Sequence, residues 1–331
     1  MTPSLEGVQK YPWGHDRRFN DLSGSLKKHF GFRVQKLSID AGFTCPNRDG
    51  SKGVGGCTFC NNQTFSPAYC SEGEPVTIQL ERGKNFFSGK YPDYKYLAYF
   101  QAYTNTYDRI DHLKALYEEA LSVPDIVGLV IGTRPDCISS ELLDYLEELA
   151  RRTFLVVEYG VESTYDHTLQ RINRGHDFKE SVTAITETAS RGIMTGAHLI
   201  LGLPGETMEM LTQQVEVINS LPLHQIKFHQ LQIIRRTVME IEYQQHPEDF
   251  SFLNPDEYTR LVVGILERLR PDLIVERFVS TAPVDMIASP RWRLKNHEMV
   301  AKIDKELERL DTWQGKYFNQ PAAFSVDKGK G

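Results

Sequence analysis

The feature that most constrains the fold is a regular alternation of short apolar stretches with longer stretches of helical periodicity. Six apolar stretches have the length and residue types of buried strands: 34–39, 96–100, 126–131, 154–157, 194–201 and 226–234. Helical patterns separate them at residues 76–87, 109–121, 141–151, 179–191 and 206–219. Apolar strands joined by helical crossovers form parallel sheets with right-handed connections. The sequence therefore predicts an α/β fold, a partial (β/α)6 barrel of the TIM type, with the loops after its strands on one face.

The rest of the chain is assigned to segments around this barrel. We expect an N-terminal arm at residues 1–33 and a barrel core at 34–236. A C-terminal α/β extension packed on the barrel would follow at 237–318, and a disordered tail at 319–331. The arm has one helical pattern near residues 22–29. The extension has helical patterns at 255–269 and 296–310 and a candidate strand at 273–278.

Composition excludes several classes of protein. The 331 residues are 40% hydrophobic and 25% charged, which is ordinary for a soluble globular protein. No apolar run is long enough to span a membrane, and the N-terminus lacks a signal-peptide core, so we expect a cytoplasmic protein with no membrane partner. The net charge of −6 argues against an indiscriminate nucleic-acid coat but leaves room for a local basic groove.

A cysteine loop follows the first predicted strand. Cys45, Cys57 and Cys60 lie within sixteen residues in the spacing C-x11-C-x2-C, and four glycines between the first two allow tight turns. The loop leaves the carboxyl end of a strand, where active sites of α/β folds collect. The odd number of cysteines, five in all, and the missing secretory signal argue against a disulfide.

Three thiolates are compatible with two kinds of metal centre. Iron–sulfur clusters and structural zinc sites ligated fully by protein both use four ligands. Three cysteines therefore favour an iron–sulfur cluster with one open iron. The alternative is a zinc-stapled α/β protein with a binding or regulatory role, in which Cys70 is the fourth ligand.

Polar residues follow several of the predicted strands. These loops lie at residues 101–107, 132–136, 158–163, 171–176 and 198–206. Each alone is explained by turns and helix caps. Together, at the same edge as the cysteine loop, they favour an active site.

On these residues the chain resembles the radical S-adenosylmethionine (SAM) superfamily. The resemblance rests on the cysteine loop, the six βα units and the turn Gly202-Leu203-Pro204-Gly205-Glu206. Residues 45–60, 100–107, 132–137 and 173–176 resemble the YhcC/YtqA group within it. That group is similar to the radical SAM domain of the Elongator catalytic subunit and, more distantly, to MiaB-type and coproporphyrinogen-dehydrogenase-type enzymes.

The resemblance implies a partial barrel of the radical SAM type with two cofactors. Cys45, Cys57 and Cys60 would bind three irons of a 4Fe–4S cluster, and SAM would bind the fourth iron. A one-electron donor such as flavodoxin or ferredoxin would reduce the cluster. Reductive cleavage of SAM would then give methionine and a 5′-deoxyadenosyl radical that abstracts hydrogen from a substrate.

The resemblance also implies which residues contact SAM. Phe59 would lie near the adenine, and the backbone around Gly202 would pair with its edge. Glu162 and Arg174 would approach the methionine end, and His198 stands where some relatives have an aspartate that reaches the ribose.

A tRNA wobble uridine is the substrate that the resemblance favours, and a protein or a small metabolite is the alternative. Basic residues late in the chain support an RNA substrate, because cations position phosphates and aromatic rings stack on unpaired bases. They are Arg235, Arg236 and, around Trp292, Arg291, Arg293 and Lys295.

Overall fold

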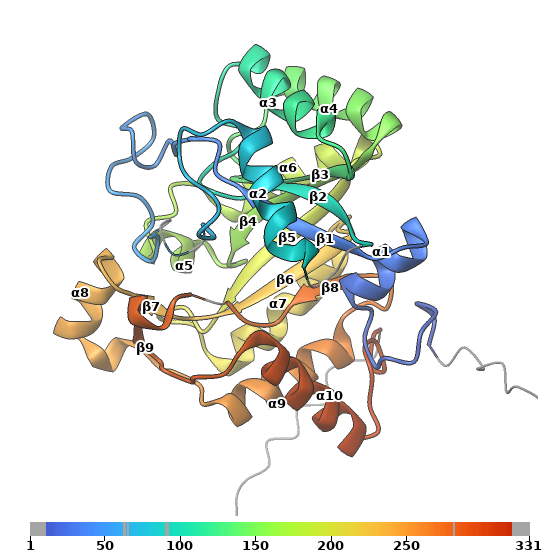
Figure 1. Cartoon of the computed structure of the whole chain (residues 1–331). Coiled ribbons are helices and arrows are strands. Elements are labelled where there is room, and N and C mark those ends of the chain that lie inside the picture. Colours follow the sequence, from blue (N-terminus) through green and yellow to red (C-terminus); the bar gives the residue numbers. More distant parts are fainter. Residues whose placement is uncertain (1–10, 62–63, 65, 90–92, 281, 320–331) are drawn as a thin grey trace, which may run out of the picture.

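The main sheet is a curled half-barrel of seven parallel strands. The computed structural model describes residues 11–61, 64, 66–89, 93–280 and 282–319. In sheet order the strands are β1 (Val34–Ile39), β2 (Lys95–Phe100), β3 (Ile126–Thr133), β4 (Phe154–Glu162), β5 (Met194–Leu201), β6 (Gln225–Gln230) and β8 (Ile274–Arg277). This arrangement confirms the predicted α/β partial barrel (Figure 1).

Helices surround the sheet (Figure 1). The crossover helices are α2 (Val76–Ser88), α3 (Ile110–Ser122), α4 (Ser140–Arg152), α6 (Phe178–Ser190) and α7 (Met208–Ser220). Later in the chain, α9 (Pro255–Arg268) packs against α7 and α10 (Asn296–Arg309). Short elements complete the fold: α5 (Asp166–Arg171), α8 (Val238–Gln245) and two 3-10 turns, Pro247–Asp249 and Val284–Met286. Within the described ranges, no helix has the length and apolar character needed to cross a bilayer.

The structure differs from the prediction after β6. The predicted strand 226–234 is too long, because β6 ends at Gln230 and a separate strand β7 (Ile233–Ile234) pairs antiparallel with β9 (Ile287–Ser289). The candidate strand 273–278 forms β8, which joins the main sheet beside β6, so that sheet has seven strands where six were predicted. The boundaries proposed at 33/34 and 236/237 stay a prediction, and the tail lies outside the described residues from 320 on.

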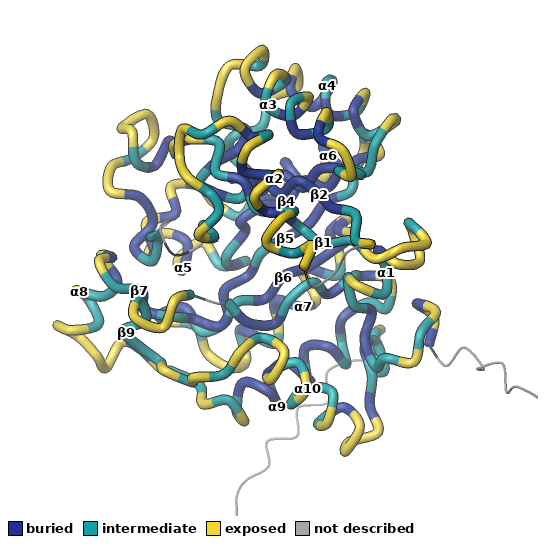
Figure 2. The backbone as a smooth tube through the Cα atoms, in the orientation of Figure 1, coloured by how far each residue is buried: buried dark blue, intermediate teal, exposed yellow. Residues whose placement is uncertain are grey.

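Strand β2 shows how the sheet buries both of its faces. Side chains alternate along a strand. Leu97 and Tyr99 therefore point into the barrel and share an apolar cluster with Leu26 of α1 (Leu22–Phe30), which packs against β1 and β8. Ala98 and Phe100 point outward into the larger core beneath the crossover helices. Figure 2 shows the result, with buried strands at the centre and exposed residues on the outer helices and loops.

Candidate active site

A cavity of about 220 Å³ opens within the barrel, and its walls come from strands β2 to β8 and from the cysteine loop. All three predicted cluster ligands, Cys45, Cys57 and Cys60, line it. The cavity therefore lies where the parallel strands end and the predicted polar loops begin.

The cysteine loop is fastened to the segment that follows α5. Buried Asn47 donates through Nδ2 to the carbonyl oxygen of Asn173 at 2.6 Å and lies 3.8 Å from the Cys57 sulfur. Asn173 in turn donates to the carbonyl oxygen of Gly56 at 2.8 Å. A Cβ on Gly53 would lie 2.2 Å from Asn47 Oδ1, so the loop needs glycine there. These contacts fix the loop before any cofactor binds.

Positive charge surrounds the thiols. Arg174 approaches the Cys57 sulfur at 3.4 Å and donates to the carbonyl oxygen of Gly160 at 2.5 Å. Arg48 donates to the carbonyl oxygen of Cys60 at 3.0 Å. Burial, and next the neighbouring Cys57, raise the pKa of Cys60 to about 11, while Arg48 acts in the opposite direction. Nearby cations stabilise thiolates, which are the form that binds metal.

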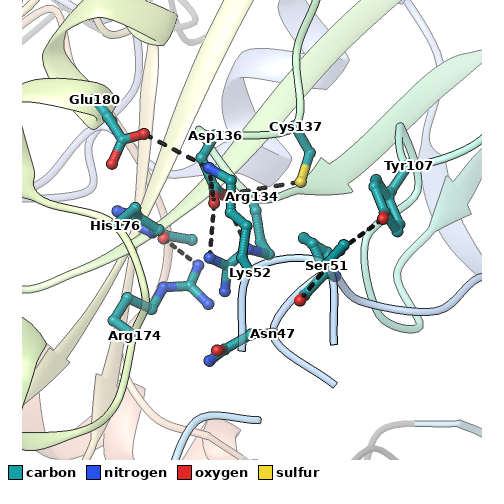
Figure 3. Close-up of polar contacts among 12 residues, drawn as sticks. Asn47, Ser51, Lys52, Tyr107, Arg134, Asp136, Cys137, Arg174, His176 and Glu180 are labelled. Atoms are coloured by element: carbon teal, nitrogen blue, oxygen red, sulfur yellow. Dashed lines mark hydrogen bonds and ion pairs between the residues drawn. The ribbon is translucent and has the colours of Figure 1, made fainter. Parts of the chain in front are cut away.

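A second ionic cluster joins the cysteine loop to the segment that follows β3 (Figure 3). Arg134 forms two hydrogen bonds with Asp136, each of 2.9 Å, and Lys52 of the cysteine loop reaches the same carboxylate at 2.8 Å. Burial alone would raise the pKa of Asp136, but Arg134 holds it well below the usual range. Burial, and then Arg174, lower the pKa of the adjacent His176 to about 3, so its imidazole is neutral at physiological pH.

The structure brings together most of the predicted SAM-contact residues. Phe59, Glu162, Arg174 and His198 line the same cavity as the three cysteines. Gly202 does not line this cavity: it follows β5 with a φ of 93° and borders a smaller pocket. The contacts of these residues with SAM stay a prediction.

The end of β4 is shaped around a charged pair. Glu162 has a φ of 68°, and the β4–β5 register shifts between Gly160 and Glu162. Such irregular backbone is concentrated at functional sites. Glu162 Oε1 lies 3.7 Å from Arg174, and a Cβ on Gly160 would lie 2.6 Å from this carboxylate and 2.7 Å from the guanidinium. A larger residue at position 160 would displace the pair from this arrangement.

Another part of the cavity lining is apolar. Phe59 packs against a cluster that contains Ile200 and Leu231, and all three side chains line the cavity. An apolar surface and an arginine–glutamate pair in one cavity fit a ligand with a flat ring at one end and charges of both signs at the other. The residues present therefore fit SAM.

A buried ionic network, which sequence reasoning missed, lies beside the cavity and contributes residues to its wall. Fully buried Glu158 accepts hydrogen bonds from Lys36 at 2.7 Å and from Lys227 at 2.9 Å, and it contacts His198 Nε2 at 2.9 Å. Gln225 donates to it at 2.7 Å. Burial opposes ionisation, but Lys227 and Lys36 hold the pKa of Glu158 well below its usual range. The sequence signal for this network is a lysine in each of two barrel strands, β1 and β6.

The same network closes the half-barrel. Strands β1 and β8 are the two ends of the main sheet. Lys36 on β1 contacts Glu276 on β8 at 2.6 Å, and Lys227 on β6 contacts it at 2.9 Å. Two ammonium groups and two carboxylates thus span the gap that the backbone ladder leaves open.

The donor set fits an iron–sulfur cluster better than zinc. Cys70 does not line the cavity, and its thiol donates instead to the carbonyl oxygen of Ser38 at 2.9 Å. In the part of the chain that the structure describes, no three His, Cys, Asp or Glu side chains are placed to hold a single metal ion. A 4Fe–4S cluster does not need such convergence, because each thiolate binds a different iron.

Fold and site together define a class of α/β half-barrels with a three-cysteine loop at the mouth. The profile of the Radical SAM superfamily matches residues 45–217, and that of the Radical_SAM C-terminal domain matches residues 223–309. The chain belongs to the radical SAM superfamily, a class of enzymes.

Relatives refine this assignment. YtqA of Bacillus subtilis is 36% identical over 94% of this chain and 96% of its own length. YhcC of Escherichia coli K12 is 33% identical over 91% of this chain and 96% of its own length. The predicted resemblance to the YhcC/YtqA group is confirmed. A shorter segment, 25% of this chain and 15% of the relative, is 36% identical to a tRNA uridine(34) acetyltransferase from Methanocaldococcus infernus.

A solved structure supports the fold. The archaeal Elp3 of Methanocaldococcus infernus, with an N-terminal deletion, superposes with a TM-score of 0.64 at 16% identity. The match covers 85% of this chain and 64% of that Elp3 chain, so less than two thirds of Elp3 is represented here. At this identity the likeness concerns the fold alone.

Proposed function

We propose that Cys45, Cys57 and Cys60 hold a 4Fe–4S cluster with one open iron and that SAM binds in the adjoining cavity. The observation behind this proposal is that three thiols and the Arg174–Glu162 pair share one cavity. When bound and reduced, the cluster supplies the electron that cleaves SAM to methionine and a 5′-deoxyadenosyl radical, which can take hydrogen from an unreactive C–H bond.

The residues of this chain would bind and orient SAM. Arg174 is suited to the methionine carboxylate, because guanidinium–carboxylate hydrogen bonds are strong and directional. Glu162 is suited to the ammonium group, and the Phe59 wall to the adenine. His198 already contacts Glu158 through Nε2, which leaves Nδ1 for the ribose. The backbone before Gly202 includes Ile200, which lines the cavity and would reach the adenine edge.

We further propose that the substrate is an unpaired base of a tRNA anticodon loop. The names of the acetyltransferase and Elongator relatives support a wobble uridine. Ile234 of β7 lines the cavity, and Arg235 and Arg236 follow it directly in the chain. A loop base is already unpaired, so extruding it into a cavity costs little.

The basic segment after β9 would contribute phosphate contacts rather than stacking. Trp292, which sequence reasoning offered as an aromatic partner for RNA, packs against Tyr258 with ring centroids 5.1 Å apart. Its Nε1 donates to the carbonyl oxygen of Leu253 at 3.1 Å, so this ring is engaged in the fold. The exposed side chains Arg291, Arg293 and Lys295 remain available to phosphates.

The cofactor proposal is tested by anaerobic reconstitution with iron and sulfide. The wild type should gain one oxygen-sensitive 4Fe–4S cluster and, with dithionite or reduced flavodoxin, should release 5′-deoxyadenosine and methionine. Cys57→Ala should lose the cluster, while Cys70→Ala, the matched control, should keep it. Tightly bound zinc that depends on Cys70 would refute the proposal and support the zinc-stapled alternative.

The substrate proposal needs a separate experiment. Nucleosides from the tRNA of cells with and without the gene should differ at a modified uridine. Unchanged nucleosides, together with no salt-sensitive tRNA binding by the purified protein, would refute an RNA substrate. A protein or small-metabolite substrate would then take its place.

A further inference from the structure

One cation that lines the cavity lacks a partner. The cavity-lining side chains of Arg48, Arg134, Arg174 and Lys227 each contact a carboxylate, a thiol or a carbonyl oxygen. Arg277, the last residue of β8, also lines the cavity and is half-buried. No hydrogen bond or ion pair joins its guanidinium to another residue that the structure describes.

The nearby carboxylates do not neutralise the positive charge of Arg277. Glu158 and Glu276 each accept contacts from both Lys36 and Lys227. Two carboxylates balance two ammonium groups, so the network is neutral without Arg277. The guanidinium is therefore an uncompensated positive charge on the cavity wall.

Two other polar side chains, His229 and Gln232, line the same cavity. His229 lies one strand away on β6, and burial, then the positive charges of His198 and Arg277, hold its pKa well below the usual range. Its imidazole is therefore neutral and can donate or accept a hydrogen bond. Gln232 lines the cavity too, and its buried Oε1 has no hydrogen-bond partner among the described residues. Buried polar atoms are normally paired, so the unpaired Oε1 of Gln232 indicates a missing ligand.

The proposed SAM contacts and this group come mostly from different elements, and they meet where His229 lies against His198 with ring centroids 5.7 Å apart. The SAM contacts come from the cysteine loop, the ends of β4 and β5, and Arg174 after α5, whereas Arg277, His229 and Gln232 come from β8, β6 and the link to β7. A ligand bound by Arg277, His229 and Gln232 would occupy the cavity beside SAM rather than in its place. That is the geometry a substrate requires.

We infer that Arg277 binds an oxyanion of the substrate, a carboxylate or a phosphate, and that His229 and Gln232 contact neutral polar atoms beside it. A guanidinium binds either oxyanion through two parallel hydrogen bonds. The inference rests on the proposed function because it treats the cavity as a radical SAM substrate site. It adds that the substrate carries a negative charge near the group that reacts.

The test measures binding of simple oxyanions to the full chain. Thermal unfolding is followed anaerobically with increasing inorganic phosphate or acetate at constant ionic strength, before and after cluster reconstitution. A ligand that binds only the folded state raises Tm saturably. The wild type should respond to at least one anion, and the stronger response identifies phosphate or carboxylate as the natural group.

Variants assign the response to Arg277. Arg277→Gln should weaken anion binding at least tenfold, and Arg277→Lys should weaken it less, because lysine keeps the charge but loses the bidentate geometry. Arg151→Gln, at an exposed arginine of α4, is the matched control and should respond like the wild type. Arg277→Lys also covers the case in which Arg277→Gln does not fold.

Two results would overturn the inference. One is equal anion responses in the wild type and both Arg277 variants, and the other is no response in the wild type. Failure of the proposed function would appear differently, as a wild type that neither gains a cluster nor binds SAM. The two failures are therefore distinguishable.

Discussion

Glu206 should make the stability of this protein fall as pH rises toward neutrality. The residue lies between β5 and α7, just before the helix cap Thr207. Its Oε1 accepts a hydrogen bond from the Ser163 hydroxyl at 2.5 Å. Burial raises the pKa of Glu206 from 4.5 to about 7.

The direction and size of the effect follow from linkage. Between pH 4.5 and about 7 the folded chain keeps a proton that the unfolded chain has released, so the free energy of unfolding decreases through this window and levels off above it. The difference between the two pKa values corresponds to about 3 kcal/mol. The adjacent N-terminus of α7 favours the ionised form by about 0.3–1 kcal/mol, so a net effect of about 2 kcal/mol is expected.

Glu206→Gln tests this reasoning, because an amide has the shape of the carboxyl group and no charge. Urea unfolding at pH 5 and pH 8 should show little change at pH 5 and a gain of about 2 kcal/mol at pH 8. Glu187→Gln on the exposed face of α6 is the control and should change stability by less than about 0.5 kcal/mol at either pH. A Glu206→Gln effect of equal size at both pH values would refute the argument.

Two further substitutions probe the cavity walls. Glu158→Gln should lower the free energy of unfolding, measured with urea, by about 3–5 kcal/mol, because it leaves Lys36 and Lys227 with one shared carboxylate. A change below about 1 kcal/mol would contradict the proposed role of the network. Gly160→Ala should weaken SAM binding more than tenfold in equilibrium dialysis without lowering the iron content, because the new Cβ would meet the Arg174–Glu162 pair. Gly264→Ala is the control: nothing lies within 4 Å of a Cβ there, so SAM binding should not change.

The sequence predicted the parts of the fold that depend on local pattern. Apolar stretches and helical periods placed β1, β2, β3 and β5 within about two residues, because buried strands of a parallel sheet are rich in apolar residues. Strand β4 was predicted too short, because its polar end from Glu158 to Glu162 reads as a loop. The end of β6 was misplaced because Ile233 and Ile234 continue the apolar run but pair with β9. That pairing joins residues more than fifty positions apart, and no local pattern encodes it.

The candidate site divides in the same way. The cysteine spacing and the resemblance supplied the thiols and four other cavity-lining residues, because each belongs to a recognisable local motif. Arg277, His229 and Gln232 belong to no motif that the sequence analysis used. They became candidates only because the fold places their polar side chains in one cavity, where Arg277 and Gln232 Oε1 have no partner among the described residues.

The buried network also explains how substrate recognition and stability can be separate in this barrel. Glu158, Glu276, Lys36 and Lys227 neutralise one another, so an anion that binds Arg277 need not break any of their contacts. The network fixes the strands around the cavity, and the unpaired guanidinium supplies the charge that selects a ligand. Glu158→Gln should therefore lower stability, whereas Arg277→Gln should mainly alter anion binding. The paired charges of Glu158, Glu276, Lys36 and Lys227 stabilise the fold, whereas the unpaired guanidinium of Arg277 makes no such contact and is better explained by a ligand.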